Sequence, residues 1–137
     1  MQFKKLHPGF ILPTKGSIHA GGLDLYMPED GSVGNTPAVI SLGFAAAVPE
    51  GYVALLLPRS SAGSKGLELT NTCGVIDSDY RGEWKAVLRT KHETIQWKAG
   101  DRLLQCVVVP VANVQPELVD ELETTERGSG GFGSSGK

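Results

Sequence analysis

At 137 residues, the chain has the length of a single domain that can bury a core without disulfides. A net charge of −2 excludes a strong basic field for nucleic acid or an anionic membrane, and no apolar run approaches the roughly 20 residues of a membrane span. Cys73 and Cys106 lack CxxC spacing and the three histidines lie far apart in sequence. We therefore expect a reducing, cytoplasmic setting and no transition metal held by the protein.

Along the chain, short segments rich in β-branched and aromatic residues alternate with turns that contain Gly, Pro, Asn and Asp. The segments predicted to be strands are 23–27, 38–42, 52–57, 84–90, 94–97 and 103–114. Only 116–123 indicates a helix, because Pro116 opens it and Leu118 and Leu122 share one face. The pattern predicts an all-β fold, as a sandwich, jelly roll or barrel.

Three connections carry more polar chemistry than a turn requires. "PRSSAGSKG" (58–66) offers hydroxyls and cations to an anion, or is a polar surface loop. "NTCGVIDSDYRGEWK" (71–85) predicts a hairpin, which either is purely structural or forms a base-sized slot with a carboxylate at its mouth. In "AGDRLLQC" (99–106), Gln105 interrupts an apolar run and needs a hydrogen-bond partner if it is buried.

The stretch "ERGSGGFGSSGK" (126–137) has five glycines in twelve residues and contains one phenylalanine. Composition alone favours a flexible tail or linker. Taken with four earlier motifs, however, this stretch is interpreted differently. The five motifs, in this order, resemble those of the trimeric dUTPases, the deoxyuridine triphosphate nucleotidohydrolases. They are "GGLDL" (21–25), "PRSS" (58–61), "GVIDSDYRGE" (74–83), "GDRLLQ" (100–105) and "RGSGGFGSSG" (127–136).

The resemblance implies a distorted jelly-roll or sandwich-like β-barrel domain over 1–126 and a flexible arm over 127–137 that closes over the active site. It also implies a homotrimer whose three sites are each assembled from all three chains. The implied reaction is hydrolysis of dUTP to dUMP and pyrophosphate with Mg²⁺, which limits uracil in DNA and supplies dUMP for thymidylate synthesis. No nucleic-acid or membrane partner is expected.

Site residues carry over from the same motifs. Asp77 would deprotonate the attacking water, because a carboxylate is ionised at neutral pH and accepts protons. Tyr80 would pack on the deoxyribose and exclude a 2′-hydroxyl. Asp24 would hold water on Mg²⁺, whose direct ligands would be phosphate oxygens and water, or would instead tie down a turn.

The remaining substrate contacts divide between base, phosphates and arm. Main-chain groups near Asn71, Gly74 and Val75–Ile76 would read uracil, while Arg59, from a neighbouring chain, would meet the phosphates. Arg127 would contact the γ-phosphate and Phe132 would stack on uracil. The full set of predicted substrate-binding residues is Arg59, Ser60, Ser61, Asn71, Gly74, Val75, Ile76, Tyr80, Lys85, Gln105, Arg127, Gly131, Phe132, Gly133, Ser134 and Ser135.

Two other functions stay open from sequence. A related dCTP deaminase would need a glutamate where this chain has Asp77. A non-catalytic jelly-roll module that binds another protein would not need the acid and the arm, both of which are present. The second motif also departs from the family, because Ser61-Ala62-Gly63-Ser64 replaces the usual Ser-Gly-Leu-Ala. We expect this turn to pack differently.

Overall fold

A computed structural model describes residues 1–131 of the chain, and its fold is all-β, as predicted. In chain order the elements are β1 (Gln2–Lys5), β2 (Thr14–Lys15), β3 (Gly22–Leu25), β4 (Gly31–Val33), β5 (Ala38–Ala47), β6 (Tyr52–Pro58), α1 (Ser60–Gly63), β7 (Leu67–Leu69), β8 (Gly74–Ile76), β9 (Glu83–Thr90), β10 (Ile95–Trp97) and β11 (Leu104–Pro110). The helical content of residues 1–131 is the short α1, so no helix there has the length and hydrophobicity that a bilayer crossing requires.

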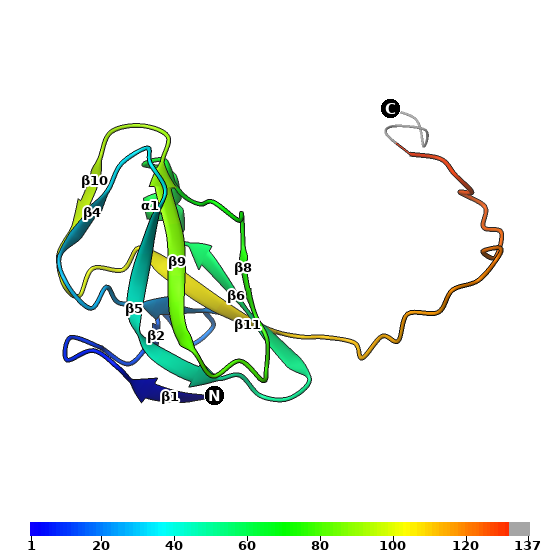
Figure 1. Ribbon diagram of the computed structural model, residues 1–137, viewed down its shortest axis with the longest axis horizontal. Helices are drawn as coiled ribbons and strands as arrows, with labels where there is room; N and C mark the ends of the chain where they lie inside the picture. Colours follow the sequence, from blue (N-terminus) through cyan, green and yellow to red (C-terminus); the bar gives the residue numbers. More distant parts are fainter. Residues whose placement is uncertain (132–137) are drawn as a thin grey trace.

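Two antiparallel sheets form the body of the molecule (Figure 1). One has the strand order β1-β5-β9-β7 and the other has the order β2-β3-β11-β6-β8, while β4 and β10 make a separate pair. Leu25, Leu56 and Leu104 of the second sheet belong to the same buried cluster as Phe44 and Trp84 of the first. The two sheets therefore face each other across one core, as the jelly-roll or sandwich prediction requires.

Strand β9 shows why these residues form sheet. Trp84, Ala86 and Leu88 are buried, and Lys85 and Arg89 between them are exposed. This period of two places one face of the strand on the core and the other in solvent. The sequence pattern of 84–90 therefore determined the position of this strand.

Strand β5 is twice the predicted length because it continues through a bulge. The register with β9 shifts between Ser41 and Ala45. Gly43 lies at the irregularity with φ of +72°, a left-handed conformation that favours glycine. Its carbonyl accepts hydrogen bonds from the main-chain N–H groups of Leu6 and His7, at 2.9 and 3.0 Å. The bulge thus fastens the chain after β1 to the middle of the first sheet.

The predicted helix over 116–123 is wrong. Strand β11 ends at Pro110, and residues 111–131 continue as an extended segment that leaves the body (Figure 1). Leu118 is 100% exposed and Leu122 is 86% exposed. Isolated helices of two turns are unstable in water without a packing surface, and residues 116–123 are all exposed within the described chain, 1–131.

Candidate active site

Residues 77–82 connect the two sheets, so the predicted hairpin over 71–85 is wrong. Strand β8 pairs with β6 in the five-stranded sheet, with Val75 opposite Leu55. Strand β9, on the other side of the turn, pairs with β5 and β7 in the four-stranded sheet. The turn therefore crosses from one sheet to the other and presents its side chains at the edge of the sandwich.

Asp77, the predicted base, follows β8 directly and is exposed to solvent. Its carbonyl accepts the main-chain N–H of Tyr80 at 3.3 Å, which closes the turn. Arg81 Nη1 donates to the carbonyls of Ser78 and Tyr80, at 2.6 and 3.0 Å. The turn is thus held by its own main chain and by Arg81, which leaves the Asp77 carboxylate free to face solvent or substrate.

Strand β8 is the outer strand of its sheet, beyond β6. A strand in this position presents a row of main-chain N–H and C=O groups along its free edge. Val75 is 61% exposed there, and Ile76 is half-buried. Gly74 lies against β6, where an added Cβ would come within 3.0 Å of the Cβ of Leu56. These features suit the predicted reading of a base by the main chain.

The turn that precedes β8 contains a strained residue. Thr72 has φ of +67°, a left-handed conformation that is unusual for a β-branched residue. The main-chain N–H of Cys73 donates to the carbonyl of Asn71 at 2.7 Å, and that of Thr72 donates to Leu69 at 3.0 Å. Such strain tends to occur at binding sites. The strained turn at Thr72 places exposed Asn71 next to the start of β8.

Tyr80 and Lys85 lie on either side of Glu83. The Tyr80 ring is 43% exposed, and its hydroxyl donates to the Glu83 carbonyl at 3.1 Å. Lys85 Nζ lies 3.5 Å from the Glu83 carboxylate. Ser41 donates a hydrogen bond to the same carboxylate, which, followed by the charge of Lys85, holds the pKa of Glu83 below its usual value. Lys85 is therefore engaged within its own sheet.

The second motif forms the start of α1. The main-chain N–H of Arg59 donates to the Leu103 carbonyl at 2.9 Å, and Ser60 and Ser61 are exposed in the first helical positions. Ala62 is buried at 4% exposure. Of the three residues that depart from the family pattern, Ala62 therefore packs into the core, while Gly63 and Ser64 are exposed.

Asp24 is buried at 7% exposure and contacts two arginines. Its Oδ1 lies 2.8 Å from Arg59 Nε, and its Oδ2 lies 3.1 Å from Arg102 Nη1. These partners are side chains, so the alternative of a turn tied by main-chain N–H groups does not describe Asp24 within residues 1–131. Sequence reasoning missed Arg102, although it lies inside the fourth motif.

Gln105 is the neighbour of Asp24 across strands β3 and β11. Its Nε2 donates to the Pro58 carbonyl at 3.3 Å, which supplies the partner that its position demanded. Its Oε1 lies over Gly22, where an added Cβ would be 2.7 Å away. The glycine in the first motif therefore makes room for the amide, and the first, second and fourth motifs meet at this end of the sheet.

The base end and the phosphate end of the predicted site do not meet within one chain. Ile76, next to Asp77, pairs with Ala54 of β6, whereas Arg59 follows the opposite end of the same strand. Five residues separate Ala54 from Arg59, or roughly 17 Å at about 3.3 Å per residue. One triphosphate α-phosphorus cannot contact both groups of the same chain.

The arm residues are only partly described. Arg127 is exposed and its Nε donates to the Gly130 carbonyl at 2.9 Å, while Gly131 is exposed. Phe132, Gly133, Ser134 and Ser135 lie outside the described residues. The predicted contacts of the arm therefore stay predictions.

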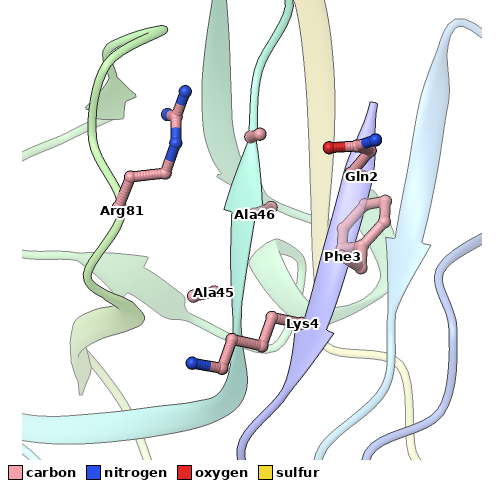
Figure 2. Close-up of a pocket in the computed structure, with 7 residues that line it drawn as sticks. Gln2, Phe3, Lys4, Ala45, Ala46 and Arg81 are labelled. Carbon is pink, nitrogen blue, oxygen red and sulfur yellow. The ribbon is translucent and has the colours of Figure 1, made fainter.

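One cavity, of about 640 Å³, is not lined by the predicted substrate residues. It lies between β1, β5 and the loop before β9, where Lys4 and Arg81 flank Ala45 and Ala46 (Figure 2). A smaller one, lined by Ser61, Lys65 and Arg102 beside α1, does include a predicted residue. Two cations line each cavity, and Asp101 adds a carboxylate to the smaller one, so the predicted site is defined by its motif residues rather than by the charge of a cavity.

Comparisons with known proteins agree over nearly the whole chain. The dUTPase family model matches residues 9–136. A deoxyuridine 5'-triphosphate nucleotidohydrolase of Syntrophotalea carbinolica is 40% identical, covering 99% of this chain and 96% of that protein. One of Escherichia phage T5 is also 40% identical, covering 99% and 98%. A solved structure of a Staphylococcus bacteriophage 80alpha dUTPase variant with dUpNHpp is 28% identical, with a TM-score of 0.90 over 99% of this chain and 98% of that one. The chain therefore belongs to the dUTPase family.

Proposed function

We propose that this protein hydrolyses dUTP to dUMP and pyrophosphate. The observation that carries the proposal is the position of Asp77, an exposed carboxylate one residue beyond an edge strand whose main chain is free to bind a base. Related proteins named deoxyuridine 5'-triphosphate nucleotidohydrolase support the substrate. By this reaction the protein would limit dUTP available for DNA synthesis and supply dUMP for thymidylate.

Recognition of uracil would come from the free edge of β8. Uracil presents alternating acceptors and one donor, which main-chain N–H and C=O groups near Asn71 and Val75 complement as a neighbouring strand would. A narrow slot excludes the thymine methyl group, and cytosine presents the wrong donors and acceptors.

In the chemical step, Asp77 would accept a proton from a water molecule whose oxygen attacks the α-phosphorus. The bond from the α-phosphorus to the bridging oxygen of the β-phosphate breaks, and pyrophosphate leaves. Asp77 suits this role because it is exposed and its turn is held by Arg81 rather than by its own carboxylate. Positive side chains at the other end of the site, from Arg59 and Arg102, would balance the phosphate charge.

The residues fit a magnesium ion that arrives on the triphosphate. No group of three or more His, Cys, Asp or Glu side chains within residues 1–131 is arranged to hold a metal. Asp24 Oδ2 accepts a hydrogen bond from Arg102, Oδ1 forms an ion pair with Arg59, and each oxygen retains a further acceptor position, so this carboxylate could hold a metal-bound water. When bound, Mg²⁺ would neutralise charge on the phosphates.

We also propose that the active unit is a homotrimer with shared sites. The separation of roughly 17 Å between Ala54, which pairs with Ile76 beside Asp77, and Arg59 supports this, because Asp77 and Arg59 of one chain cannot serve the same phosphate. The extended segment after Pro110 supports it too, since Val114, Leu118 and Leu122 are exposed and apolar. Burying such side chains against another copy is favourable.

The decisive experiment incubates purified protein with Mg²⁺ and each of dUTP, dTTP, dCTP and UTP, and measures pyrophosphate. We expect turnover of dUTP, with the other nucleotides at least about a hundredfold poorer in kcat/KM, because a site built to pair with polar edges rejects mismatched analogues. Comparable turnover of dCTP, or deoxyuridine products from it, would contradict the proposal.

A further inference from the structure

The Tyr80 ring lies directly on the main chain of Gly82. A Cβ added at Gly82 would be 2.3 Å from the Tyr80 hydroxyl oxygen, 2.5 Å from Cζ and 2.9 Å from Cε2. Distances below 3.0 Å do not occur for real Cβ atoms, so any side chain at this position must displace the ring. The contact involves three atoms along the far edge of the ring rather than one flexible tip.

Gly82 is not required by its own backbone. Its φ lies outside the left-handed range that the positive-φ glycines of the chain adopt, such as Gly43 and Gly66. An alanine could therefore adopt the Gly82 conformation without backbone strain. What the position supplies is a surface without a side chain, on which the ring rests.

The hydroxyl end of the ring, which an added Cβ at Gly82 would approach most closely, is tethered to the sheet. The Tyr80 hydroxyl donates to the Glu83 carbonyl at 3.1 Å, and Glu83 is the first residue of β9. The Glu83 side chain is bound by Ser41 and lies 3.5 Å from Lys85 Nζ. The hydroxyl is therefore anchored to a residue that is itself held, while the rest of the ring is exposed and free to be moved by a new neighbour.

We infer that Gly82 is a positioning residue for sugar discrimination: by carrying no side chain, it lets Tyr80 occupy the place where a ribose 2′-hydroxyl would have to lie. The inference rests on the proposed function and on the position that the family resemblance implies for Tyr80, against the deoxyribose. Rejection by shape depends on the ring position, and a shift of about 1 Å can change rates by up to about a hundredfold. Gly82 acts only through Tyr80 and touches no substrate.

The test measures kcat/KM for dUTP and for UTP in the wild-type protein and in Gly82→Ala. We expect the preference for dUTP over UTP to fall about tenfold in Gly82→Ala, as the displaced ring no longer fills the space beside the sugar. Thermal unfolding should stay within about 2 °C of wild type, because the ring is exposed and can move. Gly34→Ala is the matched control, since a Cβ there would make an ordinary 3.6 Å contact with Thr94 Oγ1, and its preference should be unchanged.

A double-mutant comparison separates positioning from a general structural effect. In a Tyr80→Ala background, Gly82→Ala should have no further effect on the dUTP/UTP preference, because the ring through which it acts is gone. If Gly82→Ala is poorly folded, Tyr80→Phe provides a second test, because it removes only the hydrogen bond to the Glu83 carbonyl. Tyr80→Phe should lower the preference for dUTP over UTP by less than the tenfold expected for Gly82→Ala. The inference is overturned if the dUTP/UTP preference is unchanged in both Gly82→Ala and Tyr80→Phe. It is also overturned if Gly82→Ala lowers the preference equally in the wild-type and the Tyr80→Ala backgrounds. A wild-type protein that does not hydrolyse dUTP overturns the proposed function itself.

Discussion

The Asp24 carboxylate holds the Arg59 guanidinium, with Oδ1 2.8 Å from Nε. A second arginine, Arg102, lies 3.1 Å from Oδ2. Asp24 lies in β3, Arg59 follows β6 and Arg102 precedes β11. Since these three strands are consecutive in the five-stranded sheet, the carboxylate joins the ends of all three and fixes two cations at the phosphate end of the proposed site.

Asp24→Asn should therefore destabilise the fold and weaken triphosphate binding together. Loss of the charge leaves two guanidinium groups without their partner, which should lower the free energy of unfolding by about 2 kcal/mol. Urea unfolding followed by Trp fluorescence measures this change. Asp30→Asn is the control, because the Asp30–Lys98 pair is on the surface and its loss should change little. Equal stability losses in the two variants would show that Asp24 is an ordinary surface partner.

Asp77→Asn should reduce kcat by about a hundredfold or more, because the amide keeps the shape of the carboxylate but cannot accept the proton. Affinity for a non-hydrolysable dUTP analogue, measured by calorimetry, should change little. Asp79→Asn provides the control within the same turn, since Asp79 is also exposed and has no role in the proposed mechanism. Near-native turnover in Asp77→Asn, or an equal loss in Asp79→Asn, would refute the assignment of the base.

The strands that were predicted correctly are those whose own sequence carries a clear pattern. Alternation of apolar and polar residues located β9, and a continuous apolar run located β6 and most of β11, because those signals lie within each segment. The short strands β1, β2, β4 and β7 were not found, since edge positions and lengths of two to four residues leave little periodicity.

The hairpin and the helix failed for reasons that involve distant parts of the molecule. Turn residues in 77–82 do not specify whether the strands on each side pair with one another, and here β6 and β5 provide the pairing instead. Leu118 and Leu122 have helical spacing, but no surface of their own chain covers them. The Asp24 contacts were missed in part because Arg59 and Arg102 approach it only through the order of the strands.

Mixing two inactive variants should test the shared site. Light scattering of the wild-type protein should first give three times 14.5 kDa. When Arg59→Ala and Asp77→Asn chains are refolded together in equal amounts, random assortment should restore about one site in four, because each site would take these residues from different chains. Recovery of about a quarter of the activity supports the arrangement. No recovery in mixed trimers, or an active monomer, would contradict it.

Burial gives the protein a specific sensitivity to high pH. Burial raises the pKa of the Cys106 thiol from 9.0 to about 11. Between these values the unfolded chain loses the proton while the folded chain keeps it, so stability falls as pH rises from 9.0 towards about 11. Between pH 8 and pH 10.5, Cys106→Ala should lose about 2 kcal/mol less stability than wild type in urea unfolding. Cys73→Ala is the control, and an equal flattening of its pH dependence would show that Cys106 is not the cause.

Ending the chain after Glu126 should abolish activity without disturbing the fold. The truncation removes Arg127 and Phe132 but none of the strands described within residues 1–131, since the last of them, β11, ends at Pro110. Thermal stability and the mass from light scattering should therefore hold. The activity should collapse because the arm would supply contacts to the γ-phosphate and would exclude water from the closed site.

Limited proteolysis should show whether residues 127–137 close over bound nucleotide or stay exposed when it binds. Arg127 is exposed and held only by a local hydrogen bond to the Gly130 carbonyl, so trypsin should cleave there readily in the free protein. A non-hydrolysable dUTP analogue should slow this cleavage, because closure over the ligand would bury the bond. Cleavage within the body, after exposed Lys91 in the loop that follows β9, serves as the control for general stabilisation by ligand. Full activity in the truncated protein, together with equal cleavage at Arg127 with and without the analogue, would assign residues 127–137 to a linker with no part in catalysis.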